Sequence, residues 1–466
     1  MKNGSLKVML AHIPVKIGQP MENAKNHIEQ MKSANADNVN LLLFSELSLT
    51  GYTCADLFLT SDLIAESHRA IDSLINESKP LDVIAIVGAP MLINGALYNC
   101  AIVIYKGKIL GIVPKSHIPN YRHNYESRYF ASGLNLPGNI TVSALGDDVQ
   151  FGTRLLFTCR NMKEFTFGIE ISHDMLYPIS PSASHSIAGA NLICNLAANA
   201  IHAGESDRIR RSVTANSERL QCAYLYSSGS QGESTTDLYY SSDKIIVAMD
   251  RALCDNARTL TGIIDLQEIA GIRRNESIYS SVVDSDYSYI EFEMKEYSLP
   301  VEPKSKTPFL PQGGEIEDFL SEVFEIQTMG LIRRMEAANA SSLVIGISGG
   351  LDSTLSLLVC YNAMKKAGLT TDKIHAVTMP CFGTTKKSYK NGHELMELIG
   401  CNSIEIDIKD AVTDGLKMIE HDFSPDTTYE NAQARQRAML LMNIANKYGS
   451  IVVGTSDLSE IAIGFS

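Results

Sequence analysis

The chain has 466 residues, of which 45% are hydrophobic, and it carries a formal net charge of −13. At ~150 residues per domain this length predicts two or more domains, and the apolar content suffices for complete cores. The acidic balance argues against nucleic acid or an anionic membrane as a partner. No apolar run approaches the ~18 residues of a membrane span, and Met1–Ile17 lacks the layout of a signal peptide.

The nine cysteines are scattered along the chain without a CxxC pair. This spacing indicates neither a zinc site nor a disulfide framework. Buried free thiols are typical of a reducing compartment, so the sequence predicts a cytoplasmic protein. Cys159 and Cys194 are interpreted as core residues rather than as nucleophiles.

Short apolar runs recur through the first 275 residues, as expected for the strands of a sheet. Helices are predicted between some of them, over Met21–Ala36 and Ser61–Ser78. We interpret residues 1–275 as one α/β domain. The predicted strands are Val8–Ile13, Leu41–Phe44, Val83–Val87, Ala101–Ile104, Phe165–Ile171, Asn191–Leu196, Ala223–Tyr226 and Ile245–Ala248.

Residues 276–311 have the least regular pattern in the chain and contain Pro300, Pro303, Pro308 and Pro311. Proline lacks a backbone donor and restricts the residue before it, so closely spaced prolines disfavour helices and central strands. This range is therefore predicted to be an inter-domain linker.

Helices and strands alternate from residue 312 to residue 466. Strands that alternate with helices of ten or more residues indicate βαβ units, so this domain is predicted to be a doubly wound parallel sheet. The predicted helices are Ile316–Ala338, Asp352–Ala367 and Lys387–Ile399, and the predicted strands are Leu343–Ile347, Ile374–Met379, Ser403–Ile408 and Ile451–Val453.

The sequence LVIGISGGLDST at 343–354 combines an apolar strand, a glycine turn and the start of a helix. Gly349 and Gly350 allow a polyphosphate to approach the main chain, and amides that open a helix donate to anions. Asp352 in such an anion site is explained by a divalent cation that arrives with the phosphates. Because no Lys-Ser/Thr pair ends the motif, it is not a Walker A loop.

The motif resembles the pyrophosphate loop of the ATP pyrophosphatases, which cleave ATP to AMP and pyrophosphate while they adenylate a substrate. The resemblance assigns ATP binding to Ser348, Gly349, Gly350, Leu351, Asp352 and Ser353.

Three separated segments place chemically capable side chains just after apolar runs. FSELSLTGY contains Glu46, VPKSHIPNYRHNYESRYF contains Lys115, Tyr121 and Glu126, and FGIEISHDMLYP contains Ser172. Together they resemble the nitrilase, or carbon–nitrogen hydrolase, superfamily. The resemblance implies a four-layer αββα sandwich in which Glu46 is general base and acid and Lys115 stabilises the oxyanion. It also puts Ser172 at the nucleophile position, assigns glutamine binding to Tyr121 and Glu126, and predicts that the three catalytic side chains converge.

The third segment departs from the family pattern, which reads approximately GxEICEDLW. Ser172 stands in place of the nucleophilic cysteine, and His173 and Leu176 replace Glu and Trp. A thiol titrates near pH ~8.5 whereas a serine hydroxyl is far less acidic, so glutaminase activity is predicted to be absent or strongly reduced. His173 is not expected to help, because consecutive side chains of a strand point to opposite faces.

Further segments of the second domain extend this pattern. VTMPCFGTT follows the second predicted strand, where adenine and ribose contacts occur in a doubly wound sheet. ENAQARQR contains Arg435 and Arg437, and IVVGTSDLSE contains Thr455 and Glu460. With QGESTTDLYY in the first domain, the whole chain resembles the glutamine-dependent NAD synthetases.

This second resemblance implies an adenine nucleotide α-hydrolase-like fold for residues 312–466. It implies that Asp352 and Glu460 hold magnesium and that Thr455 contacts ATP. Arg435 and Arg437 are expected to position the nucleotide or dinucleotide.

The same resemblance implies a ligase of NAD biosynthesis that converts deamido-NAD, ATP and ammonia into NAD, AMP and pyrophosphate with Mg²⁺. In the family the ammonia comes from glutamine and passes through an internal tunnel, and a homo-oligomer is expected. The family continues well beyond the final sequence IAIGFS, so the chain is expected to be C-terminally truncated and its second domain incomplete. For this incomplete domain the expectation is magnesium-dependent ATP binding that is weak at best, without appreciable NAD formation from deamido-NAD and ammonia.

Other functions are also considered. A GMP- or asparagine-type synthetase uses a different glutaminase domain, so the nitrilase-like segment argues against it. A glutaminase-dead, ammonia-dependent synthetase and a non-catalytic assembly subunit both stay open, because Ser172 replaces the nucleophile and the expected C-terminus is missing.

Overall fold

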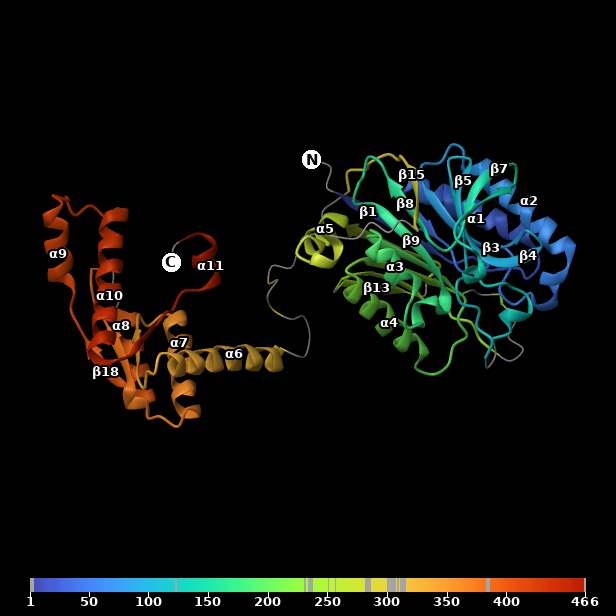
Figure 1. The fold of residues 1–466 in the computed structure, drawn as a ribbon. Coiled ribbons are helices and arrows are strands. Elements are labelled where there is room, and N and C mark those ends of the chain that lie inside the picture. The colour runs from blue at the N-terminus through green and yellow to red at the C-terminus, as the bar shows by residue number, and fades with distance from the viewer. Residues whose placement is uncertain are drawn as a thin grey trace. The chain divides into compact units, whose positions relative to one another are not determined.

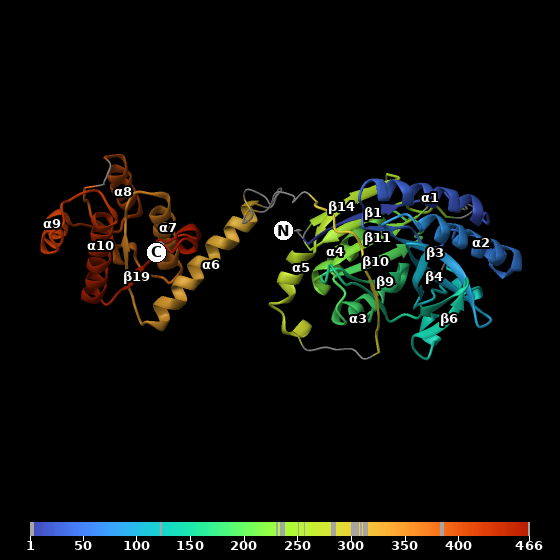
Figure 2. The same cartoon turned by 90° about the horizontal axis from the view of Figure 1, so that it is seen from above.

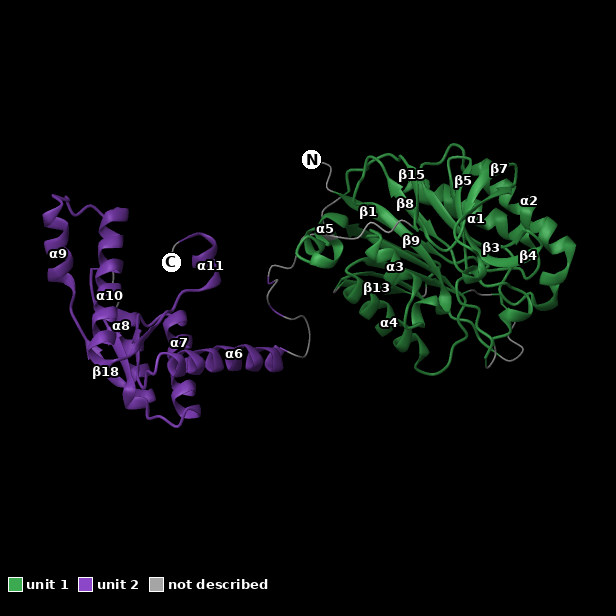
Figure 3. Cartoon of the chain, in the orientation of Figure 1, with its two compact units in different colours: residues 1–303 green, residues 304–466 purple. Residues whose placement is uncertain are grey.

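The structure is a computed structural model. It describes residues 4–121, 124–229, 232–233, 238–249, 251–255, 257–280, 286–299, 307, 310, 316–382 and 386–464. The chain divides into two compact units, residues 1–303 and 304–466 (Figure 3). Pro300, Pro303, Pro308 and Pro311 of the predicted linker lie outside the described residues. None of the described helices combines the length and the apolar character needed to cross a membrane.

Two sheets form the inner layers of the N-terminal unit. Among the described residues their strand orders are β14-β1-β2-β3-β4-β5-β7-β6 and β13-β12-β11-β10-β9-β8-β15. The strands are β1 (Ser5–Ala11), β2 (Leu41–Leu43), β3 (Ile84–Ile93), β4 (Ala96–Tyr105), β5 (Lys108–Pro114), β6 (Ile140–Ala144), β7 (Asp147–Phe151), β8 (Leu155–Cys159), β9 (Thr166–Ile171), β10 (Leu192–Ala197), β11 (Ala223–Ser228), β12 (Lys244–Ala248), β13 (Arg251–Asp255), β14 (Thr259–Asp265) and β15 (Ser288–Phe292).

Helices cover the outer face of each sheet (Figures 1 and 2). α1 (Pro20–Ala36) and α2 (Ser61–Ser78) pack on the first sheet, and α3 (Pro181–Ile187) and α4 (Glu205–Leu220) pack on the second. Separate buried clusters fill the two helix–sheet interfaces and the space between the sheets. The αββα sandwich expected from the resemblance is therefore confirmed. The remaining elements are α5 (Leu266–Arg273) and the short 3₁₀ helices η1 (Ala55–Leu59), η2 (Glu126–Arg128), η3 (Gly133–Asn135), η4 (Ser172–Leu176) and η5 (Ser277–Ser280).

The apolar residues of helix α2 recur with a spacing that is a local property of the sequence. Its buried residues Leu63, Ser67, Ala70 and Leu74 recur every three or four positions, which places them on the face that meets the sheet. The predicted bounds of this helix and its observed bounds are the same, Ser61 and Ser78.

Strands β13 and β15 of the second sheet are not among the strands predicted from the sequence. All five residues of β13 are exposed, as is possible for an edge strand that is covered on neither face. β15 lies within 276–311 and pairs in parallel with β8. Part of the range predicted as linker therefore belongs to the second sheet, where the residues of β15 alternate between exposed and less exposed positions.

The C-terminal unit contains a parallel four-stranded sheet among its described residues, in the order β18-β17-β16-β19. Buried apolar clusters lie on both faces of this sheet, one with α6, α7 and α8 and the other with α9 and α10. The predicted doubly wound architecture is therefore confirmed. Its elements are α6 (Ile316–Ala337), β16 (Leu343–Gly346), α7 (Leu351–Lys366), η6 (Thr371–Lys373), β17 (Ile374–Thr378), α8 (Lys386–Ile399), β18 (Asn402–Glu405), α9 (Lys409–Met418), α10 (Thr427–Tyr448), β19 (Ile451–Val453) and α11 (Leu458–Ala462).

Candidate active sites

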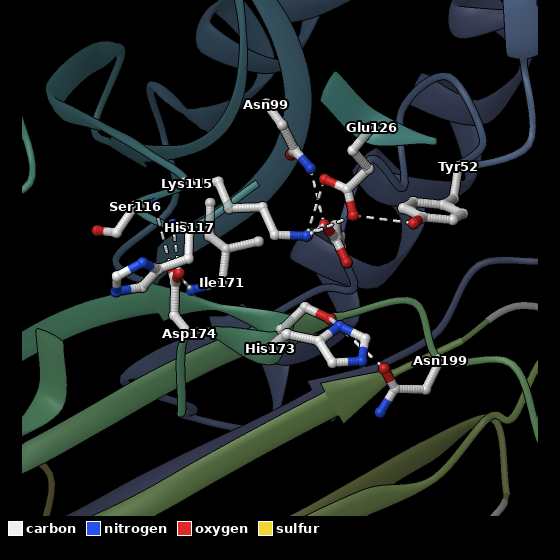
Figure 4. Close-up of polar contacts among 12 residues, drawn as sticks. Tyr52, Asn99, Lys115, Ser116, His117, Glu126, Ile171, His173, Asp174 and Asn199 are labelled. Carbon is white, nitrogen blue, oxygen red and sulfur yellow. Dashed lines mark hydrogen bonds and ion pairs between the residues drawn. The ribbon is translucent and has the colours of Figure 1, made fainter. Parts of the chain in front are cut away.

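The three predicted catalytic residues of the N-terminal unit follow the ends of strands, and Figure 4 shows the polar contacts around Lys115. Glu46 follows β2, Lys115 follows β5, and Ser172 follows β9. All three are buried, with relative exposures of 2%, 0% and 3%. Hydrogen bonds within the sheet fix the backbone that precedes a residue at a strand end. The loop that follows leaves its side chain room to form a site.

Lys115 is the centre of a buried ion cluster. Its Nζ lies 2.7 Å from Glu46 Oε1 and 2.7 and 2.9 Å from the two carboxylate oxygens of Glu126. Asn99 Nδ2 donates to Glu46 Oε1 at 2.7 Å, and the Tyr52 hydroxyl donates to Glu126 Oε1 at 2.9 Å. One ammonium is thus shared between two carboxylates, whose remaining contacts are neutral donors.

Burial and like charge set the protonation of this cluster. Burial raises the pKa of Glu46 to about 7; Lys115 opposes the shift and the Glu126 carboxylate adds to it. Burial alone would lower the pKa of Lys115, but the two carboxylates outweigh it and raise that pKa. Glu46 Oε2 is buried and has no hydrogen-bond partner among the described residues. Glu46 thus combines a raised pKa with a buried carboxylate oxygen that has no partner among the described residues.

Ser172 lies at a sharp turn between β9 and η4. Its φ is 54°, a left-handed conformation that residues with a Cβ rarely adopt. Asn195 holds this turn, because its Oδ1 accepts from Ser172 N at 2.9 Å and its Nδ2 donates to Ser172 O at 3.2 Å. Among the described residues, no hydrogen bond joins Ser172 Oγ to Glu46 or Lys115; its contacts are His173 Nδ1 and Asn199 Oδ1, each at 3.4 Å.

The structure removes the geometric reason for which His173 was not expected to help. Ser172 and His173 belong to the 3₁₀ helix η4 rather than to a strand, so their side chains do not alternate between opposite faces. The left-handed turn at Ser172 instead brings the two side chains together.

Asp174 joins the Ser172 turn to the loop that carries Lys115. Its carboxylate accepts from the backbone amides of Ser116 and His117 at 3.1 and 2.7 Å, and from Ile171 N at 3.2 Å (Figure 4). Burial raises the pKa of Asp174 to about 7, while Lys115 and these amides oppose the shift. Sequence reasoning did not single out Asp174. The available signal was a carboxylate two residues beyond the expected nucleophile.

The predicted glutamine-binding residues occupy different environments. Glu126 belongs to the ion cluster, whereas the Tyr121 side chain is 50% exposed on the loop after β5. Glu233 of the QGESTTDLYY segment accepts from the backbone amides of Tyr52 and Thr53 at 2.7 and 2.9 Å. Residues 231 and 234–237 of that segment lie outside the described residues.

Cys159 and Cys194 are fully buried. Both side chains belong to the apolar cluster between the two sheets. Burial raises the pKa of both thiols, which opposes thiolate formation.

The SGGLDS loop connects β16 to α7, as a phosphate cradle requires. Gly349 has a φ of 78°, and a Cβ built there would lie 2.0 Å from the carbonyl oxygen of Ser388. Ser348 Oγ lies 3.1 Å from Ser353 Oγ and accepts from Gly350 N at 3.2 Å. Only glycine fits at position 349, so the tight turn is fixed by the sequence itself.

A cavity of about 860 Å³ opens beside this loop. Its volume is in the range of small-molecule sites. Thr378 Oγ1 at the end of β17 is buried and has no hydrogen-bond partner among the described residues, and its side chain lines the same cavity. Lining residues that bear on the predictions are Ser348, Gly350, Arg437, Thr455 and Glu460.

Arg435 and Arg437 do not lie together. Arg437 lines the cavity beside SGGLDS, and its Nε donates to Met379 O at 3.4 Å. Arg435 lines a different cavity, between α9 and α10. Residues two positions apart on a helix point in nearly opposite directions, so the expectation that both arginines serve one site is not supported.

The carboxylates predicted to hold magnesium come from two helices. Glu460 of α11 lines the cavity, and Asp352 is exposed in the first turn of α7, next to Leu351, which is 86% exposed. Within the described part of the chain, no three His, Cys, Asp or Glu side chains form a metal-binding group.

Comparisons with known proteins agree with the division of the chain into two units. The family model for carbon-nitrogen hydrolase matches residues 9–222, and the model for NAD synthase matches residues 324–466. The chain is 33% identical to the glutamine-dependent NAD(+) synthetase of Mycobacterium tuberculosis strain H37Rv, over 100% of this chain and 71% of that relative. It is 28% identical to the synthetase of Thermotoga maritima, over 99% of this chain and 76% of the relative.

Among solved structures, a glutamine-dependent NAD(+) synthetase from Cytophaga hutchinsonii is 20% identical, with a TM-score of 0.49 over 99% of this chain and 76% of that one. The identity to the mycobacterial relative over the whole chain determines the family. The chain belongs to the glutamine-dependent NAD(+) synthetases.

Proposed function

We propose that this protein is a ligase of NAD biosynthesis that amidates the carboxylate of deamido-NAD at the expense of ATP. The products are NAD, AMP and pyrophosphate, and the nitrogen derives from glutamine. The observation that carries the proposal is that one chain contains both a buried Glu46–Lys115 cluster and an SGGLDS turn beside a nucleotide-sized cavity. The substrates are small and soluble, and a cytoplasmic homo-oligomer is part of the proposal.

In the N-terminal unit, glutamine would bind with its carboxamide between Ser172 and Lys115. The Lys115 ammonium, held by two carboxylates, would stabilise the oxyanion that forms during attack. Glu46 Oε2, which has no hydrogen-bond partner among the described residues, would accept a proton from the water that releases glutamate. Glu126 would act mainly by fixing Lys115, and Tyr121 would contact the exposed end of the substrate.

In the C-terminal unit, ATP would bind with its phosphates on the SGGLDS turn. Ser348, Ser353 and the amides that open α7 would bind the phosphates, with Thr455 as a further contact. Arg437 would position the dinucleotide. The carboxylate of deamido-NAD would attack the α-phosphorus of ATP, and the bond from that phosphorus to pyrophosphate would break. Ammonia would then attack the carbonyl carbon of the acyl adenylate, AMP would leave, and loss of a proton from the nitrogen would give the amide of NAD.

The residues present suit a magnesium ion that is held mainly by phosphates. Mg²⁺ usually keeps several waters and takes one or two protein carboxylates at nucleotide sites. Asp352 and Glu460 would supply these carboxylates; Glu460 already faces the cavity. Bound magnesium would neutralise phosphate charge during adenylation.

A non-catalytic assembly subunit explains the N-terminal site poorly. Burying an ammonium and two carboxylates costs several kcal/mol per ion before pairing, and apolar replacements are often neutral or stabilising. An unpartnered Glu46 Oε2 adds to that cost. Retaining this arrangement is expected where it serves a reaction.

The proposal is tested by NAD formation from deamido-NAD and ATP with magnesium, using either glutamine or an ammonium salt as the nitrogen source. We expect ATP-dependent NAD formation with both, slower with glutamine because Ser172 replaces cysteine. Mass spectrometry of the products identifies AMP and pyrophosphate. Failure to form NAD from either nitrogen source would contradict the proposal.

A further inference from the structure

The base beside the Ser172 hydroxyl is His173 and not Glu46, the general base that the family pattern implies. Its Oγ lies 3.4 Å from His173 Nδ1, and no hydrogen bond joins it to either oxygen of Glu46 among the described residues. Glu46 Oε1 is instead occupied by Lys115 and Asn99. The inference drawn from this contact rests on the proposed amide-hydrolysing role of the N-terminal site.

A serine nucleophile needs a base that acts during the attack. A thiol titrates near pH ~8.5 and can be largely ionised by a positive neighbour before it reacts. A hydroxyl has no comparable ionised population, so its proton must leave as the bond forms. A base within hydrogen-bond reach of Oγ meets this requirement, and in apo structures such contacts are often long.

Asn199 directs the hydroxyl but cannot take its proton. Its Nδ2 donates to the Tyr226 hydroxyl, which leaves Oδ1 facing Ser172 Oγ at 3.4 Å. A carboxamide oxygen is a hydrogen-bond acceptor and not a base. Of the two side chains that contact Ser172 Oγ among the described residues, the imidazole of His173, in the tautomer with Nδ1 unprotonated, is therefore the one able to take the proton.

A carboxylate of the neighbouring helix α4 interacts with His173. Glu205 of α4 forms an ion pair with Arg208 and also interacts electrostatically with the His173 ring. A nearby negative charge stabilises an imidazolium. The same carboxylate interacts with His202, an exposed histidine on the loop before α4.

We propose that Ser172 and His173 form a catalytic pair that replaces the cysteine chemistry of the family at this site. Ser172 Oγ bonds to the γ-carboxamide carbon of glutamine while its proton passes to His173 Nδ1. The C–N bond then breaks, and the proton from His173 leaves with ammonia. Water attacks the resulting γ-glutamyl ester, a proton passes to a base, and glutamate is released with restoration of the Ser172 hydroxyl.

The pair is tested with an alkyl fluorophosphonate, which reacts with activated serines independently of glutamine and ATP. The Ser172 Oγ–P bond forms, the P–F bond breaks, fluoride leaves and the proton passes to His173. Intact-mass spectrometry of the full chain should show one phosphonyl group at Ser172, located by peptide mapping. Ser172→Ala should remove this label.

His173→Gln should slow the labelling by about 10²-fold or more, the range of general-base effects. His202→Gln is the matched control, because it removes a histidine that interacts with the same Glu205 without contacting Ser172, and its labelling rate should be unchanged. Equal labelling rates in His173→Gln and the unsubstituted chain would overturn the proposal, and so would an unlabelled Ser172 in the unsubstituted chain.

A double substitution separates a chemical role from a structural one. In a Ser172→Cys background, His173→Gln should change glutamine hydrolysis by less than about tenfold, because a thiolate needs no base during attack. If His173→Gln lowers glutamine hydrolysis in the Ser172→Cys background by as large a factor as it lowers labelling in the serine protein, His173 only maintains the fold of the site. That result would overturn the proposed catalytic pair. NAD formation from ammonium salts bypasses Ser172, so failure of the labelling test leaves the proposed function intact.

Discussion

Ser172, the proposed nucleophile, has a left-handed backbone with a φ of 54°. Ser172→Cys keeps the Cβ and the turn but supplies a sulfur that ionises far more readily. We expect the rate of glutamate release from glutamine to rise by several orders of magnitude in this variant.

The negative control for this comparison is Ser172→Ala, which should release no glutamate. If Ser172→Cys gives no gain, His173 and Leu176 must also alter the site. Rapid hydrolysis by the unsubstituted serine protein, equal to that of the cysteine variant, would contradict the prediction.

Gly349 is the residue on which the nucleotide turn depends. A Cβ at this position would lie 2.0 Å from Ser388 O, and the φ of 78° is unfavourable for any other residue. Gly349→Ala should therefore distort the turn and weaken ATP–magnesium binding by about tenfold or more, measured by calorimetry. Gly415→Ala in α9 is the control, since nothing lies within 4 Å of its Cβ position. Equal affinities in the two variants would contradict this assignment.

At the scale of elements, β3 positions the turn that carries Glu46. A Cβ at Gly88 would lie 2.3 Å from Leu47 N and 2.5 Å from Ser45 O, so the turn can pack on β3 only because residue 88 is glycine. In a Ser172→Cys background, Gly88→Ala should displace Glu46 from Lys115 and lower both the stability of the N-terminal unit and the rate of glutamate release.

Gly271→Ala in α5 is the matched control for this substitution, because its nearest neighbour is a flexible arginine terminus at 3.6 Å. Alanine in a helix should leave stability unchanged or raise it by roughly 0.5–1 kcal/mol. Denaturant unfolding and glutamate release check both variants. A Gly88→Ala protein with unchanged activity would show that the Glu46 turn tolerates displacement.

Helix α10 separates its two arginines between different surfaces. Arg437→Ala should weaken binding of deamido-NAD or ATP, because Arg437 lines the cavity beside SGGLDS. Arg435→Ala should leave both affinities unchanged, because Arg435 lines the cavity between α9 and α10. Calorimetry on the pair of variants is decisive, and an equal loss of affinity in both would contradict the observed division.

At the scale of the whole molecule, the N-terminal unit keeps some histidines neutral in its interior. Burial lowers the pKa of His27 to about 4, although its backbone partner Asn23 opposes the shift. An unfolded histidine titrates near ~6.5, so between pH ~6.5 and ~4 the unfolded state binds the extra proton. The free energy of unfolding should therefore fall as pH decreases through this window, by roughly 2 kcal/mol for this residue at pH ~5.

His27→Gln removes this titration and should flatten the dependence of stability on pH. Hydrogen exchange of α1 amides in the full chain, near pH ~7 and ~5, measures the effect after correction for intrinsic rates. A slope as steep in the variant as in the unsubstituted chain would assign the acid sensitivity to other groups, such as His185, whose pKa burial also lowers to about 4.

Patterns that operate over a few residues were readable from the sequence. The period of α2, the alternation of helices and strands after residue 312, and the glycine turn at 348–353 all depend on neighbours in the chain. Glu46, Lys115 and Ser172 were identified from the joint resemblance of three segments to the nitrilase superfamily, and in the structure each follows a strand. Local backbone preference and side-chain period are properties of the chain itself, so the sequence alone determined these features.

Only the tertiary structure decided which distant groups meet. Asp174 binds the amides after Lys115, β15 joins β8 from a segment predicted to be linker, and His173 turns towards Ser172. Each depends on contacts between segments far apart in sequence or on a left-handed turn that hydrogen bonds from another strand hold in place. Such contacts are fixed by packing and burial, which no local pattern records.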